Sequence, residues 1–495
     1  MMRKLSVPLA LMVAALTSAC TLEPHYQRPA PPIAAQYPIG QAVQPDRATL
    51  PAASTAAADL GWQDFFGDPR LKQLITLALQ NNRDLRVAML NVQASRAQYQ
   101  IERASLFPSI GVNASKTASR TPANLSDTHQ AMVSDAYQTG ASVQWELDFF
   151  GRLRSLKDQD LYKYLATAQA RKAAQILLVS QVADQYMTLS ASHAQLAVTE
   201  ATLKSSQASY QLVQSQYTAG TASELDVQQA KTVVDQATAN QSEQTRIWLQ
   251  AQNALVLLIG EPLPADLPAG LPLDDPRMVM DVPAGLPADL LTRRPDIMAA
   301  EDSLRASNAN IGAARAAFFP TISITGSGGS ASSLLSGLFK AGSGAWTFVP
   351  SLTMPIFTAG SNLANLDLAH VEKNIAVAQY EKAIQTAFRE VADGLDASAT
   401  YGDQLTAQSH YTADYQRTLD LSTLRYQTGS DSYLQVLTAQ NALYSAQQGL
   451  ISTRLNQLTA RIDLYGALGG GWVAHTGDPA ADPAGDAQTM PANKV

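Results

Sequence analysis

The sequence RYQTGSDSYLQV at residues 425–436 is matched by YTAGTASELDV at residues 217–227, so one pattern occurs twice in the chain. Tyr, Gly, Ser, Leu and Val fall in the same register in both copies, and each copy joins two long helical patterns rich in Ala and Gln. Gly220 and Gly429 suit the left-handed residue that ends a helix, where a side chain would clash. Each copy therefore predicts a tight turn between two helices.

The residues after each glycine predict where the next helix begins. Ser223 is followed three positions later by Asp226, and Ser432 by Gln435. Ser is a favoured N-cap residue, and an acidic or amide side chain three positions on can complete a capping box. We therefore expect a capped helix start in both copies.

Composition excludes several classes of protein. Of the 495 residues only 16% are charged and 7% aromatic, which suits long, closely packed helices better than a bulky globular core. The net charge of −7 gives no electrostatic footprint for nucleic acid. A single cysteine, Cys20, excludes an internal disulfide and a cysteine-rich metal site.

The N-terminal segment predicts export from the cytoplasm. Arg3 and Lys4 precede an apolar run at 5–16 and the small residues 17–19, directly before Cys20. This pattern resembles a bacterial lipoprotein signal at 1–19, with Cys20 as the acylated first residue of the mature chain. One departure is Thr17, where such signals usually have Leu. The alternative is an ordinary secretory peptide with an incidental cysteine.

Two long helical patterns frame the turns. One runs from Gly151 to about Thr218, about 100 Å if continuous, and its counterpart runs from Gly360 to about Thr428. After each turn the chain runs back as a second helix. Prolines between 262 and 287 forbid helix between the two halves. We expect these parts: signal peptide 1–19, N-terminal arm and equatorial segment 20–70, first repeat 71–260, Pro-rich equatorial linker 261–293, second repeat 294–466 and C-terminal tail 467–495.

Four segments alternate apolar and polar residues and predict β-strands with one apolar and one polar face. In the clearest of them, Tyr137, Val143 and Trp145 alternate with polar neighbours. Each segment is close to the roughly ten residues that a tilted strand needs to cross a bilayer. The expected strands cover residues about 106–120, 136–150, 318–330 and 345–358.

Strands that cross a membrane would have to be shared between chains. In lipid every strand edge must be paired, and four strands are too few to close a barrel. The alternative is an ordinary half-buried sheet in a periplasmic protein, which is the commoner meaning of alternation. The long helices have nothing in their own half to pack around except each other. We therefore interpret the helices and strands as the wall of a tube. The polar face of each strand would line its lumen.

These features together resemble the outer membrane factor family, the TolC superfamily, and most closely its NodT/OprM-type lipoprotein branch of RND efflux systems. The residues that carry the resemblance are the cysteine with PHYQRP at 24–29, the segment 62–71, both Phe-Pro-(Ser/Thr)-Ile strand starts and both turns. The resemblance implies a mixed α and transmembrane β fold with an internal duplication. It implies a homotrimer with a 12-stranded β-barrel, four strands per chain, continuous with a long α-helical barrel.

The resemblance also assigns functional residues to the two turns, position by position. The resemblance implies that both turns dock on a periplasmic membrane fusion (adaptor) protein, through Tyr217, Gly220, Ser223, Leu225, Arg425, Tyr426, Gly429 and Ser432. It implies a closing gate at the second turn, where Leu434 matches an apolar constriction residue. One helical turn after Leu434 the family often has an Asp, and this chain has Thr438 at that position. Gate candidates are Leu434, Asp431, Thr438, Gln435 and Asp226.

The function implied is a passive exit duct in the outer membrane that takes drugs and other small molecules from an RND inner-membrane pump through the adaptor. Its other contacts would be with outer membrane lipid, and apart from the lipid on Cys20 we expect no cofactor and no metal. No catalytic constellation is apparent, so we do not expect an enzyme. Two alternatives remain: a TolC-like duct for type I protein secretion, and a lipid-anchored periplasmic coiled-coil scaffold without a pore.

Overall fold

The computed structural model falls into two compact units. The predicted signal peptide and Cys20 lie outside the described residues, which are 21–34, 37, 56–127, 129–282 and 289–478. Within that part of the chain, the strand unit comprises 21–30, 91–167 and 299–380, and the helical unit comprises 31–90, 168–298 and 381–478.

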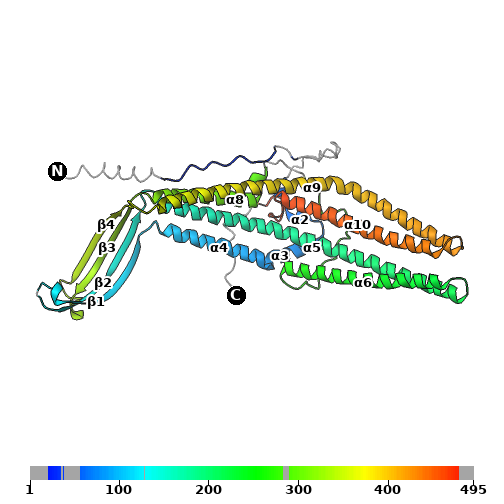
Figure 1. Ribbon diagram of the computed structural model, residues 1–495, viewed down its shortest axis with the longest axis horizontal. Helices are drawn as coiled ribbons and strands as arrows, with labels where there is room; N and C mark the ends of the chain where they lie inside the picture. The colour runs from blue at the N-terminus through cyan, green and yellow to red at the C-terminus, as the bar shows by residue number, and fades with distance from the viewer. Residues whose placement is uncertain (1–20, 35–36, 38–55, 128, 283–288, 479–495) are drawn as a thin grey trace. The chain divides into compact units, whose positions relative to one another are not determined.

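The strand unit contains one antiparallel sheet in the order β1-β2-β3-β4 (Figure 1). Some strand ends lie a few residues from the predicted ones. At the first, the turn after α4 continues to Phe107, whose N–H donates to the carbonyl of Ala104 at 3.0 Å, and Pro108 has no N–H to donate. The strands are β1 (Ser109–Thr121), β2 (Met132–Leu147), β3 (Thr321–Ser332) and β4 (Gly344–Thr353).

Apolar and polar residues alternate in register across all four strands. One row contains Ile110, Val143, Gly326 and Phe348, and the adjacent row contains Gly111, Ser142, Ser327 and Thr347. In the polar row the hydroxyls of Ser327 and Thr347 are 2.7 Å apart, and those of Ser323 and Ser351, on the same face, are also 2.7 Å apart. The predicted alternation of an apolar and a polar face is confirmed.

The sheet has two open edges among the described residues. β1 pairs only with β2, and β4 pairs only with β3. Because three antiparallel pairings separate them, β1 and β4 run in opposite directions. Large apolar side chains on these edge strands are uncovered, with Val112 85% and Trp346 80% exposed. A sheet of this kind is incomplete as a soluble element, since open edges and apolar faces favour association.

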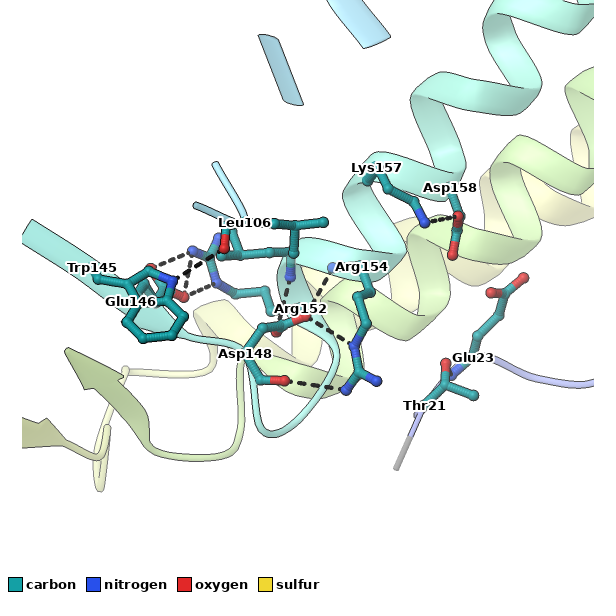
Figure 2. Close-up of polar contacts among 11 residues, drawn as sticks. Thr21, Glu23, Leu106, Trp145, Glu146, Asp148, Arg152, Arg154, Lys157 and Asp158 are labelled. Carbon is teal, nitrogen blue, oxygen red and sulfur yellow. Dashed lines mark hydrogen bonds and ion pairs between the residues drawn. The ribbon is translucent and has the colours of Figure 1, made fainter. Parts of the chain in front are cut away.

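The junction between β2 and α5 (Arg152–Thr218) is held by charged groups (Figure 2). Asp148 accepts from the backbone N–H of Leu153 at 3.1 Å and of Arg154 at 2.9 Å, so it satisfies two donors of the first helical turn. Arg154 also donates to Asp148 from its side chain, and Arg152 binds Glu146 with two hydrogen bonds of 2.8 Å. These contacts explain why β2 ends at Leu147.

The N-terminal arm, residues 21–30, runs along α8 (Pro295–Ala316). Arg315 donates to the carbonyl of Leu22 at 3.2 Å, and further along α8 the buried carboxylate of Glu301 binds Arg28 at 2.7 Å. In Figure 2, Thr21 and Glu23 lie beside the first turns of α5. Gly312 of α8 also lies against both Glu23 and Ser155. The start of the arm is therefore at the end of α8 that leads into β3.

The helical unit is built on two antiparallel hairpins (Figure 1). One is formed by α5 and α6 (Glu224–Ile259), the other by α9 (Ser361–Gln427) and α10 (Tyr433–Ala467). The helices end close to where the sequence predicts. The remaining elements are α2 (Trp62–Phe65), α3 (Pro69–Asn81), α4 (Arg83–Ala104), α7 (Leu290–Arg293) and the short 3₁₀ segments η2 (Ala57–Asp59), η3 (Ala123–Leu125) and η5 (Leu335–Gly337).

Aromatic residues and backbone hydrogen bonds join the segment before α3 to the C-terminal part of the helical unit. Phe65 stacks on Tyr465 with ring centroids 3.9 Å apart, and the Tyr465 hydroxyl donates to the carbonyl of Leu60 at 2.6 Å. The backbone N–H of Trp62 donates to the carbonyl of Val473 at 3.0 Å. The predicted tail thus begins with an ordered segment that pairs with the residues before α3.

The two halves repeat each other closely. α5 and α9 each have 67 residues, and α4 and α8 each have 22. Gly360 follows Gly151, and Gly429 follows Gly220, by the same 209 positions, and all four have positive φ. Identical spacing over a whole helix means that each half places its turn at the same distance along the chain from the glycine that precedes its long helix.

The linker between the halves is anchored by two side chains. Residues 261–282 contain no helix. Elsewhere in the described chain, too, no helix is long and apolar enough to cross a membrane. Asp68 is fully buried and accepts from the backbone N–H of Leu271 at 2.9 Å. Arg454 of α10 donates to the carbonyls of Leu273 and Asp274 at 3.3 and 2.8 Å.

Candidate functional site

The candidate site is the tip region, which we define as the turn between α5 and α6 and the turn between α9 and α10, residues 217–227 and 425–438. Both turns have the same backbone geometry. Gly220 (φ 78°) and Gly429 (φ 72°) are left-handed, as predicted. In each turn the glycine N–H donates to the carbonyl three residues back at 2.9 Å, and the next N–H donates five residues back at 2.8 Å. This pair of bonds is the Schellman motif.

The two helix starts that follow differ. Ser223 and Asp226 form the predicted capping box, with the Asp226 N–H donating to the Ser223 hydroxyl and the Ser223 N–H donating to the Asp226 carboxylate at 3.0 Å. Ser432 makes no side-chain capping bond, so the second box is wrong. The neutral amide of Gln435 offers the N-cap a weaker acceptor than a carboxylate.

An apolar cluster joins the two hairpins behind the turns. Val213 of α5 and Val227 of α6 pack with Tyr433 and Val436 of α10, all less than 9% exposed. The ring of Tyr426 packs beside Tyr433, with centroids 5.2 Å apart. Burial of this cluster is the main reason for the hairpins to stay together at their ends, because apolar area removed from water contributes about 25 cal/mol per Å².

Two hydrogen bonds between the hairpins fix the axial register of one hairpin against the other. The Tyr426 hydroxyl donates to the side-chain oxygen of Gln216 at 2.7 Å, and Gln440 donates to the hydroxyl of Ser206 at 3.0 Å. Burial, and to a lesser extent the carboxylate of Asp226, raise the pKa of Tyr426. Its hydroxyl therefore stays a donor over the physiological range of pH.

The remaining predicted residues point outward. Leu225 is 65% and Leu434 53% exposed, and Tyr217 is also exposed. The Thr438 hydroxyl donates to the carbonyl of Leu434 at 2.9 Å. Asp431 binds Arg425 at 2.6 Å. An exposed ion pair of this kind contributes at most about 1 kcal/mol.

Sequence reasoning missed the residues that hold the tip region together. Tyr433 and Val436 lie inside the repeated pattern, but nothing in one sequence tells which helix they face. Their spacing of three is the signal that could have identified a buried face. Gln216 and Ser206 give no such signal, because each bond joins positions more than 200 residues apart.

Replacing Gly429 by Ala should destabilise the second turn by about 1 kcal/mol, because a side chain at positive φ is strained. A Cβ there would meet no atom within 4 Å, so backbone strain is the whole effect. The G429N variant is the matched control, since Asn tolerates this conformation. Thermal unfolding should show a lower midpoint for G429A than for G429N, and equal midpoints would contradict the assignment.

The described residues contain no group of three or more His, Cys, Asp or Glu side chains that could hold a metal ion. The Asp226 carboxylate caps α6 and Asp431 pairs with Arg425. The exposed side chains Tyr217, Leu225 and Leu434 are groups that the tip region presents to its surroundings.

Comparisons with known proteins agree with this architecture. The family described as "Outer membrane efflux protein" matches residues 74–261 and 286–470. The solvent efflux pump outer membrane protein SrpC of Pseudomonas putida is 50% identical over 94% of this chain and 98% of its own length. The outer membrane protein OprJ of Pseudomonas aeruginosa is 43% identical over 94% of this chain and 95% of its own.

Solved structures give the same result. The open state of the MtrE outer membrane channel of Neisseria gonorrhoeae has a TM-score of 0.83 at 38% identity, covering 92% of this chain and all of that one. The CmeC outer membrane channel of Campylobacter jejuni has a TM-score of 0.85 at 24% identity, covering 94% and 97%, and supports the fold alone.

The chain belongs to the outer membrane efflux protein family. It is an outer membrane protein with the fold of the TolC-like channels, and its function is that of the outer membrane channel of an efflux system.

Proposed function

We propose that three copies of the chain form one exit duct, in which twelve strands close a barrel that continues into a tunnel of helices. The observation that carries the proposal is the four-stranded sheet with two open edges. Each edge needs a partner in lipid, and opposite strand directions let β4 of one copy pair antiparallel with β1 of the next. The polar row of Ser142, Ser327 and Thr347 would then face the lumen.

The duct would receive its substrates from an inner-membrane pump through a periplasmic adaptor that docks on the tip region. Relatives are named for solvent, toluene and antibiotic efflux, so small apolar and amphipathic molecules are the substrates proposed here. Of the tip residues, Tyr217 and Leu225 are exposed and free to meet an adaptor. The gate would be closed by Leu434 from each copy, an apolar side chain that its own chain leaves exposed.

The N-terminal arm supports a lipid anchor on Cys20. The carbonyl of Leu22, in the first described residues of the arm, binds Arg315 near the end of α8 that leads into β3. Two or more acyl chains make a lasting anchor. The domain division of the sequence, with an equatorial girdle made of arm, linker and tail, is part of the same proposal.

Cells fed labelled palmitate should incorporate it into the wild-type chain and into a T21A control. The C20A variant should incorporate none, because the thiol is the only acceptor in the proposal. Label in C20A, or its absence from the wild-type chain, would contradict the anchor.

Docking is tested by Leu225→Arg, which places a charge on an exposed apolar contact residue of α6. We expect an adaptor affinity at least about tenfold lower, because burying an unpaired guanidinium in an apolar contact costs more than the about 1.4 kcal/mol that a tenfold change requires. In a strain without its own duct, the variant should therefore fail to lower ethidium accumulation although it folds and reaches the membrane.

The matched control is Ala239→Arg, an exposed position further along the same helix. It should lower ethidium accumulation as the wild-type chain does. Full efflux by the Leu225 variant would exclude this turn from docking.

A further inference from the structure

A cavity of about 830 Å³ lies between the two hairpins of the helical unit, under the Pro-rich linker. α5 and α6 contribute His193 and Trp248, α9 and α10 contribute Leu405 and Leu450, and the linker contributes Leu271. Its size falls in the range of small-molecule sites, roughly 300–1,000 Å³. No lining residue belongs to either turn, and nothing in the duct function requires the cavity.

The lining combines an apolar wall with two guanidinium groups. Leu271, Leu405 and Leu450 supply aliphatic surface, and the rings of His193 and Trp248 lie 6.0 Å apart at 49°. Arg70 and Arg454 also line the cavity. This is the composition of a pocket that takes an apolar body and orients it by a few polar groups.

Neither arginine is neutralised by a contacting carboxylate in the described part of the chain. The side chain of Arg70 makes no ion pair there, and Arg454 donates only to two backbone carbonyls and to the side-chain oxygen of Gln457. Asp274 also lines the cavity, but Arg454 binds its carbonyl oxygen. Burial, and then the charge of Arg461, lower the pKa of Arg454 by more than the nearby Asp274 carboxylate raises it.

We propose that this cavity binds a small amphipathic organic anion, with its apolar body against Trp248 and the leucines and its carboxylate or sulfonate toward Arg70 and Arg454. Guanidinium groups suit planar oxyanions because they donate two parallel hydrogen bonds. A bound anion would connect the two hairpins and the linker. The site shares no residue with the tip region.

The test is calorimetric titration of the full-length protein in lipid nanodiscs with naphthalene-2-carboxylate. We expect one saturable site per chain. The neutral naphthalene-2-carboxamide should bind roughly ten- to a hundredfold more weakly, because a charge-assisted hydrogen bond is lost. Equal affinity of acid and amide, or no saturable binding of the acid, would overturn the proposal.

Variants assign the binding to the cavity. Arg70→Gln should weaken binding of the acid roughly ten- to a hundredfold and leave the amide unaffected. Lys72→Gln makes the same charge change on the same helix outside the cavity lining, so it should bind as the wild-type protein does. Trp248→Ala should weaken binding of both compounds. If Arg70→Gln and Lys72→Gln behave alike, the anion does not bind here.

Discussion

Replacing Asp68 by Ala should raise the exchange rate of the Leu271 amide hydrogen by about two to four orders of magnitude, through the loss of roughly 3–5 kcal/mol of local stability. The carboxylate is fully buried and accepts four hydrogen bonds. Two come from the first turn of α3, at Arg70 and Leu71. The others come from the Tyr186 hydroxyl at 2.8 Å and the Leu271 N–H at 2.9 Å.

The size of the effect follows from the donors that Ala would leave behind. Each buried donor without an acceptor costs about 1–3 kcal/mol, and here they belong to α3, α5 and the linker at once. Burial, and then the Asp68 carboxylate, raise the pKa of Tyr186, so its hydroxyl remains a donor that needs an acceptor. The exchange rate of the Leu271 amide in Asp68→Asn should lie between those of the wild-type protein and Asp68→Ala. The Asn amide keeps one acceptor oxygen, but its NH₂ group faces the remaining donors.

Hydrogen exchange followed by mass spectrometry measures this directly, and Asp275→Ala is the matched control. Asp275 lies on the same linker, but its carboxylate is only partly buried and accepts hydrogen bonds only from Arg277. We expect no change in exchange at Leu271 for the control. Unchanged exchange in the Asp68 variant would show that the linker is held by other contacts.

Replacing Val436 by Asp should separate the two hairpins at the tip region and make the cell permeable to large hydrophilic antibiotics. Val436 is 5% exposed in the cluster with Val213, Val227 and Tyr433. A charge without a partner in such a place costs several kcal/mol. The hairpins can avoid that cost by opening toward water, and in the proposed duct such opening widens the entrance.

The control is Asn441→Asp, an exposed position on the same helix that adds the same charge. Its antibiotic susceptibility should match the wild-type protein. Permeability should fall again when the pH is lowered, because an introduced carboxyl in an apolar setting has a raised pKa and becomes neutral as protons are added. A Val436 variant that is as impermeable as the control would mean that this cluster does not hold the duct closed.

The local chemistry of the turns could be predicted from the sequence because it depends on near neighbours. A left-handed residue at a helix end favours glycine, so Gly220 and Gly429 were predictable. The pairing of Ser223 with Asp226 was predictable for the same reason. The prediction failed at Ser432, where Gln435 replaces the carboxylate and Arg425 binds Asp431 instead. Chemically similar side chains are not equivalent as reciprocal caps.

Contacts between distant segments were beyond the sequence pattern. Asp68 reads as an ordinary helix cap before Pro69, and nothing nearby indicates that Tyr186 and Leu271 also bind it. In the sequence Arg454 is one polar residue of a helical pattern. Only the structure shows that the linker lies over it and accepts its hydrogen bonds. Such bonds depend on how hairpins pack, and one sequence contains the two partners without their pairing.

The central claim is that several chains share one barrel, and the native mass of the detergent-extracted mature protein tests it most directly. The sheet leaves the edges of β1 and β4 open, and four strands per chain close a barrel only when copies join. The account predicts a mass of three chains together with their bound lipid. A folded, monodisperse monomer would contradict the shared barrel and would leave a lipid-anchored helical scaffold as the better description.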